Sequence, residues 1–144
     1  MRCYLFDIDG TLADCSHRLH YIEKAPKDWD GFFSNCHADK SIEAICDLAH
    51  TLWQCNNIVL VSGRPERCKV DTEIWLRQNH LNWNALYMRK DGDFRNDDIV
   101  KSELLDELLS HGWKPIMAFD DRKRVVDMWR ARGIICAQVA EGDF

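Results

Sequence analysis

Phe6-Asp7-Ile8-Asp9-Gly10-Thr11-Leu12 is the segment from which both the architecture and the chemistry of this chain can be predicted. The apolar run Cys3–Phe6 before it predicts a buried strand, and side chains two residues apart in an extended chain point to the same side. Gly10 permits a sharp turn and a close approach to a bound group. Two such carboxylates suit phosphoryl transfer at a magnesium ion, one as nucleophile and the other moving a proton. The simpler alternative is a strand that ends in a polar turn, so the rest of the chain must decide.

Length and composition fit one globular domain over residues 1–144. Hydrophobic residues make up 46% of the chain and charged residues 30%, which is ordinary for such a domain. The sequence contains no apolar stretch near the roughly 18 residues of a membrane helix, and Met1 leads straight into a predicted strand rather than a signal peptide. We therefore expect no membrane association and a cytoplasmic location.

The seven cysteines are an odd number without a C-x-x-C pair, which excludes a disulfide framework and a zinc knuckle. The net charge of −5 excludes a broad basic surface for duplex nucleic acid. A local phosphate site is still compatible with that charge, because basic residues cluster near the predicted strand ends. These are Arg64, Arg67, Lys69, Arg89, Lys90, Arg95, Lys101 and Arg122.

Five short apolar runs predict strands at Cys3–Phe6, Ile58–Val61, Ala85–Met88, Ile116–Phe119 and Ile134–Val139. Between them, apolar residues at helical spacing predict helices within 42–53, 70–76, 99–109 and 125–129. Ser41 is the expected N-cap of the first helix, and Gly112 and Gly133 are expected to end the last two. Because strand and helix alternate, we predict an α/β fold, a three-layer Rossmann-like parallel sheet of about five strands.

About 50 residues separate the first two predicted strands, roughly twice what a single crossover helix requires. Residues 14–40 are therefore predicted to be a small cap insertion after the first strand. Ligands of open α/β sheets bind beyond the carboxyl ends of the strands, so this insertion is expected to overhang the site. Its aromatic residues Trp29, Phe32 and Phe33 fit equally well a helix that packs on the body of the domain.

Polar residues follow two further strands. Val61-Ser62-Gly63-Arg64 offers a hydroxyl, an adaptable backbone and a guanidinium group for phosphate oxygens, although alone it is a common turn. Asp120 and Asp121 follow the fourth predicted strand, where either a magnesium ion or a helix N-terminus would favour adjacent acids. Lys101, near the start of the preceding helix, either lies in solvent or neutralises phosphate charge in the site.

The order of these four segments, D-x-D-G-T, serine, lysine and acidic pair, resembles the haloacid dehalogenase superfamily of phosphotransferases across nearly the whole chain. Within it, the chain is similar to the 3′-phosphatase domains of the phage polynucleotide kinase–phosphatase family. The segments that carry this closer resemblance are residues 6–13, 61–64, 95–101, 120–122, 126–130 and 138–144. The resemblance implies a haloacid dehalogenase-like fold and a phosphatase activity.

The resemblance implies a role for each matching residue. Asp7 would attack phosphorus and form an aspartyl-phosphate, and Asp9 would protonate the leaving oxygen and then activate water. Mg²⁺ would be held by Asp7, by the main-chain carbonyl of Asp9, and by one or both of Asp120 and Asp121.

The remaining matching residues are expected to bind phosphate or substrate. Ser62 and Lys101 would hold the phosphoryl oxygens, and Arg18 and Arg64 would grip substrate or phosphate. Asp97 would orient Lys101 from one helical turn away. Thr11 and Gly63, which lie in the same motifs, complete the set.

The expected activity is a Mg²⁺-dependent phosphomonoesterase that removes 3′-phosphate from nucleic-acid ends or nucleotides. The chain has no G-x-x-x-x-G-K-[ST] motif, so a kinase half is not expected. The insertion differs from that of the phage domains, which leaves open a nucleotidase or a small-metabolite phosphatase, or a nucleobase stacked on Trp29, Tyr21 or Phe33. A receiver-like phospho-acceptor switch is disfavoured, because its acidic pair should precede the phosphorylated aspartate. Oligomeric state, a kinase or ligase partner, and DNA or RNA preference are not determined by the sequence.

Overall fold

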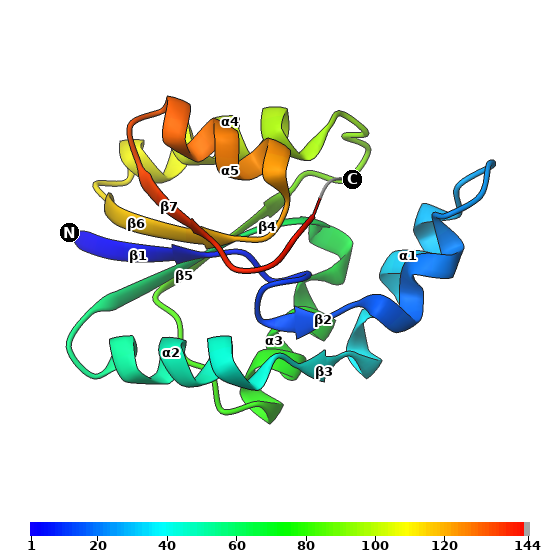
Figure 1. Ribbon diagram of the computed structural model, residues 1–144, viewed down its shortest axis with the longest axis horizontal. Helices are drawn as coiled ribbons and strands as arrows, with labels where there is room; N and C mark the ends of the chain where they lie inside the picture. The colour runs from blue at the N-terminus through cyan, green and yellow to red at the C-terminus, as the bar shows by residue number, and fades with distance from the viewer. Residues whose placement is uncertain (143–144) are drawn as a thin grey trace.

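Five parallel strands form the central sheet of the computed structural model, which describes residues 1–142 (Figure 1). They are β1 (Arg2–Phe6), β4 (Asn57–Pro65), β5 (Ala85–Arg89), β6 (Lys114–Asp120) and β7 (Ile135–Gln138), in the order β5-β4-β1-β6-β7. Every neighbouring pair is parallel. All five predicted strands are confirmed, and the last two residues of the matching segment 138–144 lie outside the described residues.

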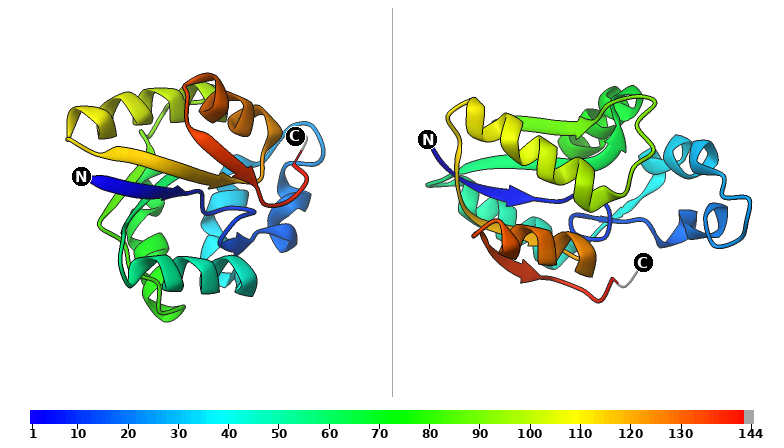
Figure 2. Two further views of the ribbon diagram at one scale, coloured as in Figure 1. Left: turned by 60° about the vertical axis from the view of Figure 1, so that its left-hand side comes forward. Right: turned by 90° about the horizontal axis from the view of Figure 1, so that it is seen from above.

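Four helices cover the two faces of this sheet, as the views in Figure 2 show. One face carries α2 (Glu43–Trp53) and α3 (Lys69–Gln78), and the other carries α4 (Asp97–Ser110) and α5 (Lys123–Ala131). Successive residues of β1 enter opposite layers, since Leu5 belongs to the core under α4 and α5 whereas Phe6 belongs to the core under α2 and α3. The predicted three-layer α/β architecture is therefore confirmed.

Of the three predicted helix ends, those at Gly112 and Gly133 are confirmed and the one at Ser41 is wrong. Gly112 and Gly133 have φ angles of +90° and +82° just beyond α4 and α5, where a left-handed residue ends a helix. The predicted N-cap Ser41 is wrong, because Ile42 occupies that position without a side-chain hydrogen bond. Ser41 instead ends β3 (Lys40–Ser41), which pairs antiparallel with β2 (Ala13–Asp14), so its backbone is committed to that ribbon.

The segment 14–40 projects beyond the carboxyl end of β1, away from the sheet (Figures 1 and 2). It contains three short helices, η1 (Ser16–Tyr21), α1 (Trp29–Ser34) and η2 (Cys36–Ala38), and the β2–β3 ribbon closes its base. Both uses expected for its aromatic residues occur. Phe33 packs against Cys68 and Met88 of the domain body, and Trp29, which is 37% exposed, lines the cavity described below together with Phe32 and Phe33.

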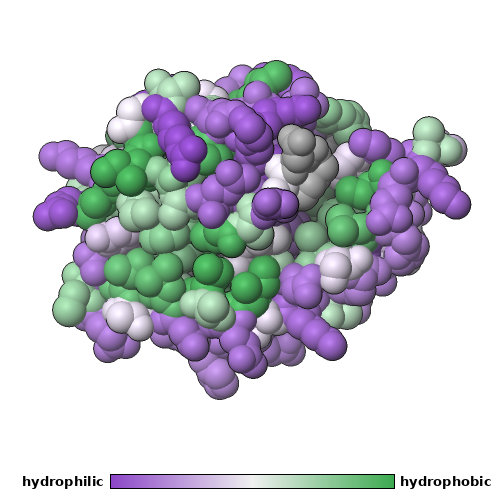
Figure 3. Space-filling view, in the orientation of Figure 1, coloured by the Kyte–Doolittle hydropathy of each residue, from purple (hydrophilic) through white to green (hydrophobic). Residues whose placement is uncertain are grey.

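Figure 3 shows apolar side chains on the face between α5 and α2. Met117 of β6 and Val139, directly after β7, are half-buried and pack against the core under α2 and α3. In the described part of the chain, every helix is too short or too polar to cross a bilayer. The cytoplasmic location stays a prediction.

Candidate active site

The functional residues meet where β1, β4 and β6 end, at the centre of the sheet (Figure 1). The strand order places β1 between the other two, so this edge is the point where crossovers leave in opposite directions and where ligands of such sheets bind. A cavity of about 560 Å³ opens there, and its lining includes Asp7, Asp9, Gly63, Asp120 and Asp121.

The turn after β1 brings its backbone against the acidic pair of β6. The amides of Thr11, Leu12 and Ala13 donate to the carbonyl of Ile8 at 2.9–3.1 Å, which closes the chain into a tight loop. Gly10 has a φ of +83°, and a Cβ atom at this position would overlap the Asp121 carboxylate. Only glycine satisfies both constraints, which explains its place directly after Asp9.

Lys101 is the cation at the centre of the site. Its Nζ donates to Asp7 Oδ1 at 2.7 Å and to Asp120 Oδ2 at 3.0 Å, and its side chain is 1% exposed. Burial alone lowers the pKa of Lys101, but the charges of Asp120 and Asp7 outweigh it and raise the pKa. Lys101 is therefore ionised in the folded protein, and of the two predicted positions it takes the one inside the site rather than in solvent, while its contact with phosphate stays a prediction.

Three buried carboxylates, those of Asp7, Asp120 and Asp121, form an acidic cluster whose oxygens lie within 4.8 Å of one another. Burial, followed by the charge of Asp120, raises the pKa of Asp7 well above its ordinary range, and the same two causes raise the pKa of Asp121. One lysine cannot neutralise three carboxylates. An all-oxygen donor set with excess negative charge fits a hard divalent cation such as Mg²⁺.

The two members of the acidic pair differ in their free acceptor capacity. Asp120 Oδ2 accepts from Lys101 and from Trp129 Nε1 at 3.2 Å, and its Oδ1 accepts from the amides of Asp121 and Arg122. These four donors occupy the four lone pairs of the Asp120 carboxylate. The Asp121 carboxylate accepts from the Thr11 hydroxyl at 3.5 Å and lies against the carboxylate of Asp7, so fewer of its acceptor positions are filled. Trp129 is a residue of the site that sequence reasoning missed, because a tryptophan on an amphipathic helix gives no signal of a polar contact.

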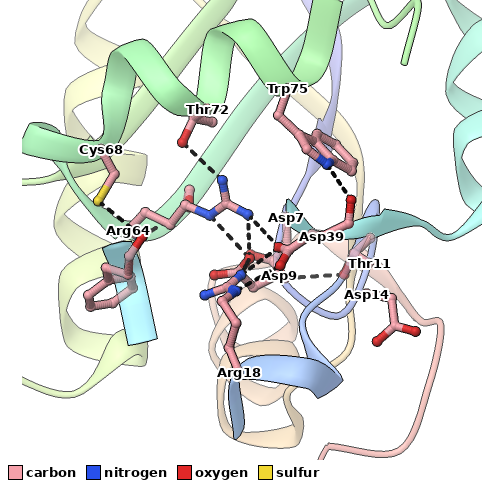
Figure 4. Close-up of polar contacts among 12 residues, drawn as sticks. Asp7, Asp9, Thr11, Asp14, Arg18, Asp39, Arg64, Cys68, Thr72 and Trp75 are labelled. Atoms are coloured by element: carbon pink, nitrogen blue, oxygen red, sulfur yellow. Dashed lines mark hydrogen bonds and ion pairs between the residues drawn. The ribbon is translucent and has the colours of Figure 1, made fainter. Parts of the chain in front are cut away.

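Asp9 is not part of the acidic cluster and points toward two arginines, Arg18 and Arg64 (Figure 4). Its Oδ1 accepts from Arg18 Nη2 at 2.8 Å and from Arg64 Nη2 at 2.6 Å. Burial alone raises the pKa of Asp9, but the charges of Arg64 and Arg18 outweigh it and hold the pKa at about 2. Asp7 and Asp9 thus lie in opposite electrostatic environments, although they are only two residues apart in the chain.

Asp39 is the second residue of the site that sequence reasoning missed. It accepts from Arg18 Nε at 2.8 Å, Arg18 Nη2 at 2.6 Å and Arg64 Nη2 at 3.1 Å (Figure 4). His17 Nε2 also lies 2.6 Å from it, and its carbonyl accepts from Trp75 Nε1 at 2.7 Å. The sequence carries only an indirect signal for Asp39, because two arginines buried near one aspartate require a further counter-charge.

Arg18 and Arg64 are both fully buried and are held by this network. Arg18 Nη1 donates to the Phe32 carbonyl at 3.0 Å, and Arg64 Nη1 donates to the Thr72 hydroxyl at 2.9 Å. Their predicted contact with substrate or phosphate stays a prediction, and so does the coordination of metal by the Asp9 carbonyl.

No hydrogen bond joins Asp97 to Lys101, so the orienting role of Asp97 stays a prediction. Its carboxylate instead accepts from Arg89 Nη2 at 2.6 Å and pairs with Arg122 at 3.3 Å. The physical reason is its place at the first residue of α4, beside β4, where a Cβ atom on Gly63 would overlap it. Its charge nevertheless adds to those that raise the pKa of Lys101.

The remaining predicted residues lie in or beneath the cavity. Thr11 Oγ1 donates to Asp7 Oδ2 at 3.2 Å, and Ser62 Oγ accepts from the Arg64 amide at 3.1 Å. The Ser62-Gly63-Arg64 motif falls inside β4 rather than after a strand end, and the pairing with β5 is irregular between Ser62 and Pro65. The phosphate-binding roles of Thr11, Ser62 and Gly63 stay predictions.

Substitution of Asp9 should change how stability depends on pH. Because the folded-state pKa of about 2 lies below the ordinary 3.8, the ionised Asp9 stabilises the protein above about pH 4, and this contribution is lost as the pH falls toward 2. We therefore expect the stability advantage of the wild type over Asp9→Asn to shrink between about pH 5 and pH 2. Urea unfolding at steps of pH measures it, and a constant difference would contradict the ion pairs described above.

Asp39→Asn should lower the free energy of unfolding by about 3–5 kcal/mol, because two buried guanidinium groups lose a counter-charge. Asp30→Asn is the matched control. It removes the exposed ion pair of Asp30 with Arg67, which contributes at most about 1 kcal/mol. Urea unfolding of both variants at neutral pH measures the two effects, and equal losses would argue against the role of Asp39.

Comparison with known sequences identifies the family of this chain. The family model of the polynucleotide kinase PNKP phosphatase domain matches residues 1–144. A protein of Autographa californica nuclear polyhedrosis virus, named as a candidate bifunctional polynucleotide kinase/RNA ligase, is 29% identical over 132 residues. The match covers 90% of this chain and 18% of the viral protein, so this chain spans less than a fifth of that relative.

Solved structures agree with the sequence comparison. A chain in the structure of a Pnkp1/Rnl/Hen1 complex matches with a TM-score of 0.85 and 29% identity, over 99% of this chain and 47% of that one. A haloacid dehalogenase-like hydrolase of Streptococcus pneumoniae shares the fold with a TM-score of 0.66 and 16% identity, over 93% of this chain and 82% of that one. The class C acid phosphatase of Bacillus anthracis also shares it, with a TM-score of 0.67 and 15% identity, over 99% of this chain and 68% of that one. This chain is therefore a haloacid dehalogenase-type phosphatase and belongs to the polynucleotide kinase PNKP phosphatase domain family.

Proposed function

We propose that this phosphatase is a Mg²⁺-dependent phosphomonoesterase that works through an aspartyl-phosphate on Asp7 and removes 3′-phosphate from nucleic-acid ends or nucleotides. The observation that carries the proposal is the separation of Asp7 and Asp9. Asp7 lies against Lys101 and the acidic pair, and Asp9 lies against two arginines. One aspartate is thereby assigned to the attack on phosphorus and the other to the movement of a proton.

In the first half-reaction, a carboxylate oxygen of Asp7 forms a bond to phosphorus while the bond from phosphorus to the ester oxygen breaks. The Lys101 ammonium, 2.7 Å from Asp7 Oδ1, offsets the negative charge spread over the phosphoryl oxygens. Asp9 gives its proton to the leaving oxygen. In the second half-reaction, Asp9 takes a proton from the water that attacks the aspartyl-phosphate, which returns Asp7 as a free carboxylate.

Asp9 must carry a proton when it acts as the acid, whereas the arginines keep it ionised in the ligand-free protein. A phosphate dianion in the cavity would bring negative charge next to Arg18 and Arg64. That charge competes with Asp9 for the two guanidinium groups and raises the pKa of Asp9. The arginine pair thus couples substrate binding to protonation of the acid.

Mg²⁺ would be held by Asp7, by Asp121 and by the main-chain carbonyl of Asp9. When bound, it neutralises charge on the phosphoryl group and on the acidic cluster. Asp120 would support the site from behind, since its acceptor positions are filled by Lys101, Trp129 and two amides. The donor set is all oxygen, which suits this ion.

The nucleic-acid substrate is supported by the family and by the relatives. The matching family is the phosphatase domain of polynucleotide kinase, and the viral relative carries polynucleotide kinase and RNA ligase in its name. A nucleotidase or a small-metabolite phosphatase would use the same catalytic residues and is the second candidate. A receiver-like switch is disfavoured, because Asp9 provides the means to hydrolyse the intermediate.

A substrate panel tests the activity. We expect Mg²⁺-dependent phosphate release, fastest from a 3′-phosphorylated oligonucleotide and slower from 3′- and 5′-mononucleotides and sugar phosphates. Chelation of Mg²⁺ should abolish it, and Asp7→Asn should reduce it by at least about 10³-fold, because the nucleophile is lost. Asp47→Asn, at an exposed position of α2, is the matched control with full activity. If Asp7→Asn were as active as the wild type, the proposed mechanism would be refuted. A preference for sugar phosphates would contradict the proposed nucleic-acid substrate.

Calorimetric titration with Mg²⁺ separates the two members of the acidic pair. We expect Asp121→Asn to weaken Mg²⁺ binding by at least about 100-fold, because it removes a direct ligand, and Asp120→Asn by about 10-fold, because it removes a supporting group. Asp120→Asn should also lower the melting temperature more, since it leaves Lys101 and Trp129 without a full acceptor. The reverse order of the two affinities would exchange their assigned roles.

A further inference from the structure

Phe94 is an exposed aromatic ring at the mouth of the active-site cavity. Its 84% exposure is the highest among the large hydrophobic side chains of residues 1–142. It belongs to the segment 90–96 between β5 and α4, and it lines the same cavity as Asp7 and Asp9. Single exposed apolar side chains are ordinary on a protein surface, but this ring lies in the wall of the cavity that contains the acidic cluster, where a bound ligand can cover it.

The backbone around Phe94 is held firmly. Arg89 Nη1 donates to the carbonyls of Asp93 at 3.0 Å and of Arg95 at 2.6 Å, the residues on either side of Phe94. Arg95 also donates to the Asp93 carboxylate at 2.8 Å and to Glu103 on α4 at 2.7 Å. The ring is therefore presented by a braced loop rather than exposed by a loose one.

Arg89 also connects the segment 90–96 to β4. Arg89 Nε donates to the Gly63 carbonyl at 2.8 Å, and its Nη2 donates to Asp97 at 2.6 Å. Gly63 lies next to Ser62 and Arg64 in β4. One side chain thus sets the position of Phe94 relative to the residues predicted to bind the phosphate.

Trp29 contributes a second aromatic ring to the cavity, from α1 of the insertion. It is 37% exposed, and the rings of Phe32 and Phe33 support it at centroid distances of 5.8 and 5.9 Å. Lys27 Nζ lies 5.6 Å from the centre of the Trp29 ring. An aromatic surface beside an exposed cation suits a nucleobase that is followed by a phosphodiester.

Three cations of the cavity wall are available to an anionic ligand. The wall carries both acidic and basic residues, and Arg67, Arg95 and Arg122 are in ion pairs with carboxylates. Lys27, Lys90 and Arg124 are exposed and form no ion pair within residues 1–142. A sugar phosphate would match the charge but has no flat π-surface to cover two rings. A single-stranded nucleic-acid end matches both features, because its bases stack and its phosphodiesters bind cations.

We infer that Phe94 and Trp29 form an aromatic clamp for the terminal nucleosides of a single-stranded nucleic acid, with Phe94 as a specificity-determining residue. This inference rests on the proposed function, because the clamp seats the nucleosides whose 3′-phosphate reaches Asp7. The clamp means that a substrate needs bases as well as a terminal phosphate in order to bind tightly.

Steady-state kinetics of Phe94→Ala test the clamp. For a 3′-phosphorylated decanucleotide we expect KM to rise about 10-fold with kcat unchanged, because one stacking surface is lost. With p-nitrophenyl phosphate, which has no nucleoside, kcat/KM should stay at the wild-type value. Phe94→Tyr keeps a ring and should restore KM. Ile135→Ala removes an apolar side chain of similar exposure on β7, outside the cavity lining, and should behave as wild type.

A binding measurement complements the kinetics. We expect a decanucleotide with 2-aminopurine at its 3′ end to lose fluorescence when it binds to the Asp7→Asn variant. A second substitution in that variant, Phe94→Ala or Trp29→Ala, should weaken the binding about 10-fold. An unchanged KM and unchanged quenching in Phe94→Ala would overturn the clamp, and so would equal losses on both kinetic substrates. If the wild type instead cleaves p-nitrophenyl phosphate but not the decanucleotide, the proposed substrate class fails, and the clamp fails with it.

Discussion

The contact of the Lys101 ammonium with Asp7 and Asp120 is the interaction on which the site depends. It joins α4 to the ends of β1 and β6, and it does so in the interior, where an unpaired charge is costly. Val100, Leu104 and Leu105, the apolar neighbours of Lys101 on α4, pack under the sheet and bring the ammonium into place. The same helix therefore packs the core and places the cation that faces the Asp7 carboxylate.

A second buried network keeps Asp9 apart from this cluster. Arg18, from the insertion, and Arg64, from β4, both donate to Asp9 and to Asp39. The insertion thereby contributes a buried side chain to the candidate site. Across the two networks, the five aspartates Asp7, Asp9, Asp39, Asp120 and Asp121 face the three cations Lys101, Arg18 and Arg64. The excess of two negative charges matches one divalent cation.

Much of this arrangement could be predicted from local sequence. The five strands and four helices follow from apolar runs and helical spacing, and the order of D-x-D-G-T, serine, lysine and acidic pair identifies the edge of the sheet that carries the site. Four features escaped because they depend on contacts across the fold. Ser41 was expected to cap a helix but pairs with Ala13, and Asp97 was expected to orient Lys101 but its carboxylate binds Arg89. Asp39 belongs to no motif, and Trp129 was given no role in the site.

The sequence by itself determined the layered α/β fold, the phosphatase family and the pair Asp7 and Asp9, because these depend on periodicity and on residues close together in the chain. Only the tertiary structure decided which charges face each carboxylate. It assigned Lys101 to Asp7 and the two arginines to Asp9, it identified Asp39 as their shared partner, and it left Asp121 rather than Asp120 with free acceptor positions. The physical reason is that side-chain electrostatics and burial depend on distances between segments that are remote in sequence.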